Sequence, residues 1–232
     1  MTENCLVIDG LNCSPLTPEQ VRRTIKGGIS AINLTAIRPQ AGPRDGLLQV
    51  QDALNIIDSM PELALVGRST TDILEAKASG RCAIIIGAQN SAMVEPDGKL
   101  LEVFKTMGLR IVQPTYNERN AFGYGASFAG GGDRGITEAG RAWVAEMNRN
   151  GLVIDLSHCG WNTSADFITE SKQPVVFSHA NAFEVCPSPR NKTDALLRDM
   201  LQSLSVSKAA REAAQVTGLS KSELYARLLE LK

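Results

Sequence analysis

The chain has 232 residues, a formal net charge of −1 and a hydrophobic fraction of 43%. This composition is typical of a globular protein, and the length suits one α/β domain with a small appendage. The near-neutral charge and the aromatic content of 5% argue against binding to nucleic acid or to an anionic membrane. No stretch approaches the roughly 18 apolar residues that cross a bilayer, and the N-terminus lacks the features of a signal peptide. We therefore expect a cytoplasmic protein that makes no membrane contact.

Short apolar runs recur along the chain and predict strands. They are too short for independent helices and rich in β-branched residues. The predicted strands are Cys5–Ile8, Ile29–Leu34, Cys82–Ile86, Leu109–Val112, Leu152–Leu156 and Pro174–Phe177. Continuous apolar strands are typical of parallel sheets that are buried on both faces. The first strand is expected to end at Asp9.

Helical patterns fill the intervals between several of these strands. Helices are predicted to begin after Thr17, at Thr70 and after Thr137, and to end near Gly27, Gly80 and Gly151, because N-capping threonines and terminal glycines mark their ends. Alternating strands and helices predict βαβ units. Six or seven strands fall short of the eight in a closed TIM-type (β/α) barrel. We expect an incomplete barrel over residues 1–204.

The C-terminal part has a different character. Residues 207–217 are alanine-rich, Gly218 breaks the pattern, and a capping box at Ser220–Glu223 begins a second helix that reaches Leu231. Two short helices with a tight glycine turn have a helix-turn-helix outline. We predict a two-helix tail over 205–232 whose apolar faces pack on the sheet.

The segment from Tyr116 to Gly135 is a long glycine-rich connection between a predicted strand and a predicted helix. Long loops of this kind are often functional lids or disordered. Its glycines match neither the dinucleotide-binding nor the P-loop pattern. Phosphate binding is therefore poorly supported.

The chain contains only two histidines, and each directly follows a predicted strand. His158 ends the run LVIDLSH and His179 ends the run PVVFSH. Barrels carry their chemistry at the C-terminal ends of strands, and imidazole is a common zinc ligand. A shared metal ion is one interpretation of this pair. Two half-buried histidines that only form hydrogen bonds are the other.

Two further charged residues are candidates. Arg190 lies in a loop fixed by Pro187 and Pro189, and its guanidinium could hold a carboxylate through two parallel hydrogen bonds. Without other information, an exposed loop arginine is the favoured interpretation. Asp9 could be a metal ligand or could simply cap the turn that follows.

Several runs together resemble the zinc-dependent dipeptidase family, peptidase family M19, whose best-known member is the renal membrane dipeptidase. The longest match is GITEAGRAWVAEMNRNGLVIDLSH from Gly135 to His158. Shorter ones are VIDG from Val7, LRIVQPTYN from Leu109, PVVFSHAN from Pro174, and Arg190-Asn191 followed by Asp194. The resemblance extends over about residues 5–203.

This resemblance implies two zinc ions at the mouth of a (β/α)₈ barrel and hydrolysis of a dipeptide by a metal-bound hydroxide. It assigns His158 and His179 to one zinc and Arg190 to the substrate carboxylate. Tyr116 replaces the family's substrate-contacting histidine, and Asn117 follows it. We therefore predict substrate contacts for Tyr116 and Asn117.

The opening run departs from the family pattern. Leu11 and Cys13 replace a histidine and an aspartate that bind the other zinc, and Gln89 replaces the glutamate that bridges the two ions. Asp9, Cys13 and Gln89 are possible additional ligands. The resemblance therefore implies one zinc or none. The family's late strands and catalytic aspartate are also absent, so no catalytic residue is assigned.

Residues 206–231 resemble the C-terminal helical segment of bacterial 16S ribosomal RNA 2′-O-methyltransferases. The methylase core is absent, so no methyltransferase activity follows.

Three functions stay open at this point. The first is a dipeptidase-like metallohydrolase with a depleted metal site. The second is a catalytically silent barrel that binds a small carboxylate or a partner. The third is a nucleic-acid-associated protein led by its tail, which the charge disfavours. A homodimer is possible under each of them.

Overall fold

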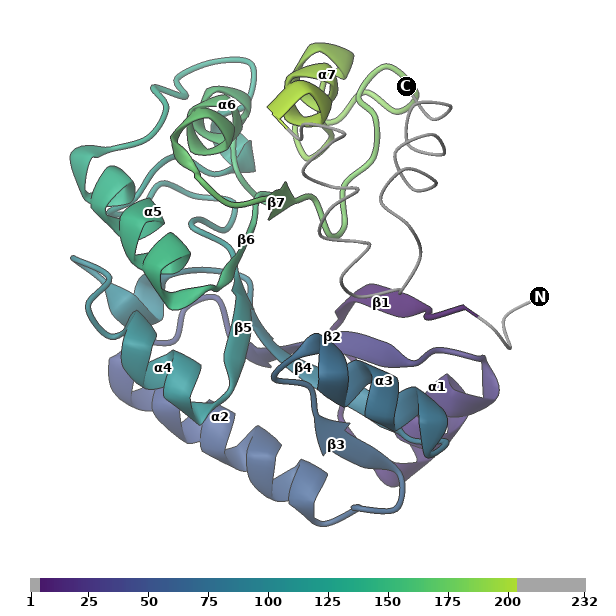
Figure 1. The fold of residues 1–232 in the computed structure, drawn as a ribbon. Coiled ribbons are helices and arrows are strands. Elements are labelled where there is room, and N and C mark those ends of the chain that lie inside the picture. Colours follow the sequence, from purple (N-terminus) through teal and green to yellow (C-terminus); the bar gives the residue numbers. More distant parts are fainter. Residues whose placement is uncertain (1–4, 204–232) are drawn as a thin grey trace.

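The computed structural model describes residues 5–203. It contains seven strands that alternate with helices (Figure 1). The strands are β1 Ile8–Asn12, β2 Ala31–Ile37, β3 Ala64–Val66, β4 Cys82–Ala88, β5 Leu109–Val112, β6 Val153–Asp155 and β7 Val175–Val176. The α-helices are α1 Pro18–Lys26, α2 Pro43–Asp58, α3 Thr70–Ala78, α4 Leu101–Met107, α5 Glu138–Asn150, α6 Trp161–Glu170 and α7 Asp194–Ser203. The tail helices predicted over 207–217 and 220–231 lie outside the described residues.

All seven strands belong to one parallel sheet. Their order is β1-β2-β4-β5-β6-β7, and β3 also pairs with β4. β3 pairs with β4 from Cys82 to Ile84, and β5 pairs with β4 from Ile86 to Ala88. The prediction of six or seven strands is confirmed. With its helices, the sheet forms an incomplete TIM-type barrel.

The sheet curls until its first and last strands approach each other. A Cβ atom added at Gly10 in β1 would lie 2.6 Å from the backbone oxygen of Ser178, just after β7. A side chain at position 10 would therefore push these two backbones apart. The carbonyl of Gly10 also accepts a hydrogen bond of 2.9 Å from Asn33 Nδ2 in β2. This contact brings the ends of β1, β2 and β7 into one region.

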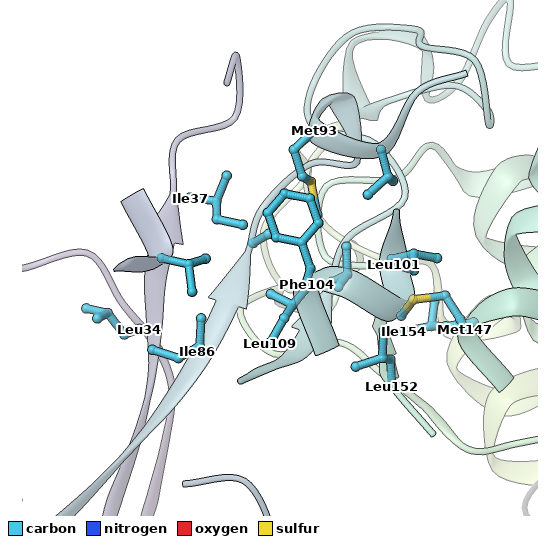
Figure 2. Packing of buried hydrophobic residues seen from close by; sticks show 14 of the residues in the cluster. Leu34, Ile37, Ile86, Met93, Leu101, Phe104, Leu109, Met147, Leu152 and Ile154 are labelled. Carbon is cyan, nitrogen blue, oxygen red and sulfur yellow. The ribbon is translucent and has the colours of Figure 1, made fainter. Parts of the chain in front are cut away.

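The main core lies between one face of the sheet and helices α1, α2, α4, α5, α6 and α7. Figure 2 shows Phe104 of α4 among buried side chains from several strands and helices, including Leu34, Ile86 and Leu109. Phe104 is fully buried. A second, smaller cluster, which contains Ile73 and Ala76 of α3, packs on alanine and isoleucine side chains of β2 and β4. Within residues 5–203 no helix is long and apolar enough to cross a membrane.

Two details of the predicted elements are corrected by the structure. The first strand was expected over Cys5–Ile8, but β1 runs from Ile8 to Asn12. Its first residue, Ile8, is 49% exposed, and its pairing with β2 continues through Asp9 and Asn12. The apolar run Cys5–Ile8 therefore predicted this edge strand too early in the sequence. Strand β3 and helices α2, α4, α6 and α7 were not predicted.

Candidate functional site

The two histidines meet where the sequence placed them. His158 follows β6 and His179 follows β7, and their ring centroids lie 4.9 Å apart. The Tyr116 ring, from the loop after β5, stacks on His158 with centroids 4.0 Å apart. Parallel strands bring their carboxyl ends to the same edge of a sheet, so three consecutive strands converge on one small site.

Each imidazole is held through its Nδ1 atom. His158 Nδ1 lies 2.8 Å from Asn117 Oδ1, and His179 Nδ1 lies 2.6 Å from Ser178 Oγ. Asn117 was predicted to contact substrate, and here it orients a histidine. His179 Nε2 is buried and has no hydrogen-bond partner among residues 5–203.

Asp155, the last residue of β6, is the centre of a buried hydrogen-bond network. It is 1% exposed. Its Oδ1 accepts from the backbone amides of Ser157 and Ser178 and from the Ser157 hydroxyl. Its Oδ2 accepts from Ser178 Oγ at 2.5 Å and Gln113 Nε2 at 2.7 Å. Ser157 Oγ in turn accepts from the backbone amide of His179. The carboxylate therefore ties the ends of β5, β6 and β7 together.

Two cations border the histidines. Arg190 donates to the backbone oxygens of Ser157 and His179, so its guanidinium lies beside both histidine backbones. It remains partly exposed. Lys192 is completely buried and donates from Nζ to Cys159 O at 2.6 Å. Both cations therefore come from the loop after β7.

Burial and these cations make the imidazoles poor bases. The pKa of His158 falls to about 2, first because the ring is buried and then because Arg190 and Lys192 oppose its protonation. Burial also lowers the pKa of His179, although Asp155 opposes that shift. Burial lowers the pKa of Lys192 to about 8. At neutral pH the site combines two uncharged imidazoles with nearby positive charge.

We call the edge formed by the carboxyl ends of the strands the mouth of the barrel. The half of the mouth at β1, β2 and β4 has no histidine. At the ends of β1, β2 and β4, Gln89 Nε2 donates to Cys13 Sγ at 3.2 Å and to Thr35 Oγ1 at 2.9 Å. Cys13 Sγ and Thr35 Oγ1 lie 3.3 Å apart. We call Cys13, Thr35 and Gln89 the neutral trio. Asp9 instead accepts from Leu11 N and Asn12 Nδ2, which matches the capping interpretation.

The glycine-rich loop from Tyr116 to Gly135 makes close contacts with the site. Gly125 forms an isolated bridge with Cys159, and a Cβ atom at Gly125 would lie 2.3 Å from the Tyr116 oxygen. Only glycine fits such a close approach. Further along, the Asp133 carboxylate accepts from the backbone amides of Gly135 and Thr163, which anchors the loop to the start of α6. These contacts hold the loop against Tyr116 and the start of α6.

The donor set is too small for a tightly held zinc ion. A catalytic zinc usually has three protein ligands and a structural zinc has four. In the part of the chain that the structure describes, no group of three or more His, Cys, Asp or Glu side chains could hold a metal ion. Among residues 5–203, His158 and His179 are a pair without a third such ligand, and the neutral trio supplies no carboxylate. These residues do not fit a two-zinc centre.

The comparison with known families decides the classification. The sequence profile described as Membrane dipeptidase (Peptidase family M19) matches residues 17–209. The chain belongs to this family. A second profile, described as the RsmI C-terminal HTH domain, matches residues 189–232, in agreement with the resemblance of the tail.

Individual M19 relatives agree with this classification. Dipeptidase tcpJ from Claviceps purpurea is 28% identical over 72% of this chain and 39% of its own length. An uncharacterized dipeptidase of Schizosaccharomyces pombe is 31% identical over 68% of this chain and 39% of its own length. The chain thus spans about two fifths of these relatives. The crystal structure of an amidohydrolase from Pseudomonas aeruginosa superposes with a TM-score of 0.83 at 32% identity, covering 94% of this chain and 71% of the other.

Sequence reasoning passed over four residues of this M19 site: Asp155, Ser157, Ser178 and Lys192. One signal was available, because a Ser-His pair follows each of two consecutive strands, at Ser157 and Ser178. The repeated serine could have indicated a shared partner for the two hydroxyls. Nothing in the polar surroundings of Lys192 indicates that it is fully buried.

Proposed function

We propose that this M19 chain binds a small dipeptide-like carboxylate at the two histidines and hydrolyses peptide bonds weakly or not at all. The observation that carries the proposal is the charge of the site. Arg190 lies beside two uncharged imidazoles, and the buried Asp155 carboxylate already accepts five hydrogen bonds. An anionic group of a ligand would therefore find hydrogen-bond donors and a positive charge at Arg190.

Calorimetric titration of the full chain with alanylalanine and with its C-terminal amide tests the proposal. The free acid should bind, and the amide should bind at least about 10-fold more weakly, since a hydrogen bond to a charged group contributes about 1.5–3 kcal/mol. Arg190→Ala should remove the difference. Arg141→Ala is the matched control, because Arg141 lies on α5 and pairs with Glu170. Equal binding of acid and amide would contradict the proposal.

Dipeptide hydrolysis with a depleted metal site is the second candidate. It is favoured by the buried Nε2 of His179, which has no hydrogen-bond partner among the described residues and lies near His158. The dipeptidase activity in the names of the relatives also favours it. Alanine release from alanylalanine, measured with and without added Zn²⁺, separates the two candidates. Zinc-dependent turnover that is lost in His179→Ala would establish hydrolysis, whereas binding without turnover supports the first proposal.

A further inference from the structure

The hydrogen bonds around His158 determine where its proton lies. Asn117 Oδ1 can only accept, and it lies 2.8 Å from His158 Nδ1. The Nδ1 atom must therefore carry the proton. In the ring that carries one proton, Nε2 is then the atom with the lone pair.

The position of the proton on His179 follows in the same way from the hydrogen bonds of Ser178. The Ser178 hydroxyl has one proton and lies 2.5 Å from Asp155 Oδ2 and 2.6 Å from His179 Nδ1. A carboxylate can only accept, so the hydroxyl donates to Asp155 and accepts from His179 Nδ1. The second oxygen of Asp155 is saturated in a similar way, by Ser157 Oγ and two backbone amides. The bare nitrogen of His179 is then Nε2, the atom that is buried without a partner among residues 5–203.

We infer that Asp155, acting through Ser178, and Asn117 are positioning residues that hold both imidazoles in the Nδ1–H tautomer. The pair then offers two Nε2 lone pairs and no ring N–H donor. A ligand must bring a metal ion, an ammonium group or an N–H to the histidines, while its carboxylate goes to Arg190. This orientation of the ligand rests on the proposed function, whereas the tautomers do not.

The test is a long-range ¹H–¹⁵N spectrum of the ¹⁵N-labelled, ligand-free full chain at neutral pH, in which protonated and bare ring nitrogens are resolved. Both histidines should be protonated at Nδ1. A wild-type His179 protonated at Nε2 would overturn the inference. The outcome does not depend on carboxylate binding, so it is independent of the titration with alanylalanine.

The sharpest variant is Asp155→Asn. The amide oxygen can keep the three bonds of Oδ1, while its NH₂ group donates to Ser178 Oγ. The Gln113 side chain can turn over to accept as well, and its Oε1 has no partner among the described residues at present. Ser178 must then donate to His179 Nδ1, so the proton of His179 moves to Nε2. His158 should keep its tautomer and serves as an internal control.

Ser178→Ala keeps the inference testable if the asparagine variant does not fold. Without the hydroxyl, His179 loses its bias and should populate both tautomers, and Ser178→Thr should restore the wild-type spectrum. Ser171→Ala is the matched control, because its hydroxyl bonds to Gln173 O away from the site. An unchanged His179 spectrum in both Asp155→Asn and Ser178→Ala would overturn the role of Asp155.

Discussion

The two halves of the mouth differ in how their polar side chains are supported. At the ends of β1, β2 and β4, the neutral trio bonds mainly to itself. At the ends of β5, β6 and β7, the histidines are backed by a buried carboxylate, an asparagine and two serines. Both halves use equivalent positions on parallel strands. One half leaves the buried Nε2 atom of His179 without a partner among residues 5–203, and in the other half the amide of Gln89 is hydrogen-bonded to its two neighbours.

This difference agrees with a depleted metal site, as we propose. The family resemblance implies zinc ligands at positions 11, 13 and 89, where this chain has Leu11, Cys13 and Gln89. The amide of Gln89 donates to a thiol and a hydroxyl. The histidine half keeps both its ring nitrogens and their supporting partners. These supporting partners are the reason to expect ligand binding there.

The largest expected effect comes from removing the carboxylate of the histidine half. Asp155→Ala should lower the free energy of unfolding by about 3–5 kcal/mol, since several buried donors lose their acceptor at about 1–3 kcal/mol each. Urea unfolding followed by circular dichroism measures the change. A loss below about 1 kcal/mol, the size of one ordinary hydrogen bond, would mean that the network is not what ties the three strands together.

Introducing the three metal ligands that the family resemblance implies should make the two halves of the mouth alike in their capacity to bind zinc. The triple variant Leu11→His, Cys13→Asp and Gln89→Glu should bind Zn²⁺ more tightly than the wild type, by more than the about 10- to 100-fold that changes in an outer partner cause. Competition with a zinc-sensitive dye measures this gain. Adding His179→Ala to the triple variant is the control, and it should remove much of the gain. If zinc affinity stays at the wild-type value, the two halves do not face a common space.

A smaller effect should follow from Arg190→Lys, which keeps the charge of the histidine half but not the planar donors. We expect about a 10-fold weaker affinity for alanylalanine, equivalent to about 1.4 kcal/mol, because an ammonium cannot make two parallel bonds to a carboxylate. Calorimetry on the two proteins gives the ratio. Unchanged affinity would indicate that Arg190 acts only on the backbone oxygens of Ser157 and His179.

The smallest effect is expected in the neutral half. Gln89→Ala removes two hydrogen bonds to partly exposed or exposed partners and should lower the free energy of unfolding by about 0.5–1.5 kcal/mol. Zn²⁺ affinity should stay unchanged. The same urea experiment applies, with Gln51→Ala as a control in which an exposed glutamine loses one bond to Asn55. A loss as large as that of Asp155→Ala would remove the proposed asymmetry.

The convergence of His158 and His179 could be predicted from sequence, since each follows an apolar run and parallel strands end together. The role of Asn117 could not, because its partner lies 41 positions away and depends on how the glycine-rich loop folds behind Tyr116. The burial of Lys192 could not be predicted either, because it depends on the packing of α6. Strand β3 escaped because three residues are too few to show a pattern, and β1 was displaced because its pairing residues are partly polar.

The approach of Gly10 to Ser178 couples the two halves mechanically. Because Gly10 has no side chain, the backbone of β1 lies directly against the Ser178 carbonyl, with no rotamer between them to adjust when either strand moves. Movement of β7 when a ligand reaches His179 would therefore be transmitted to β1 and, through the bond from Asn33 to the Gly10 carbonyl, to β2. The lack of a Cβ atom at position 10 is therefore what lets the two ends of the sheet touch.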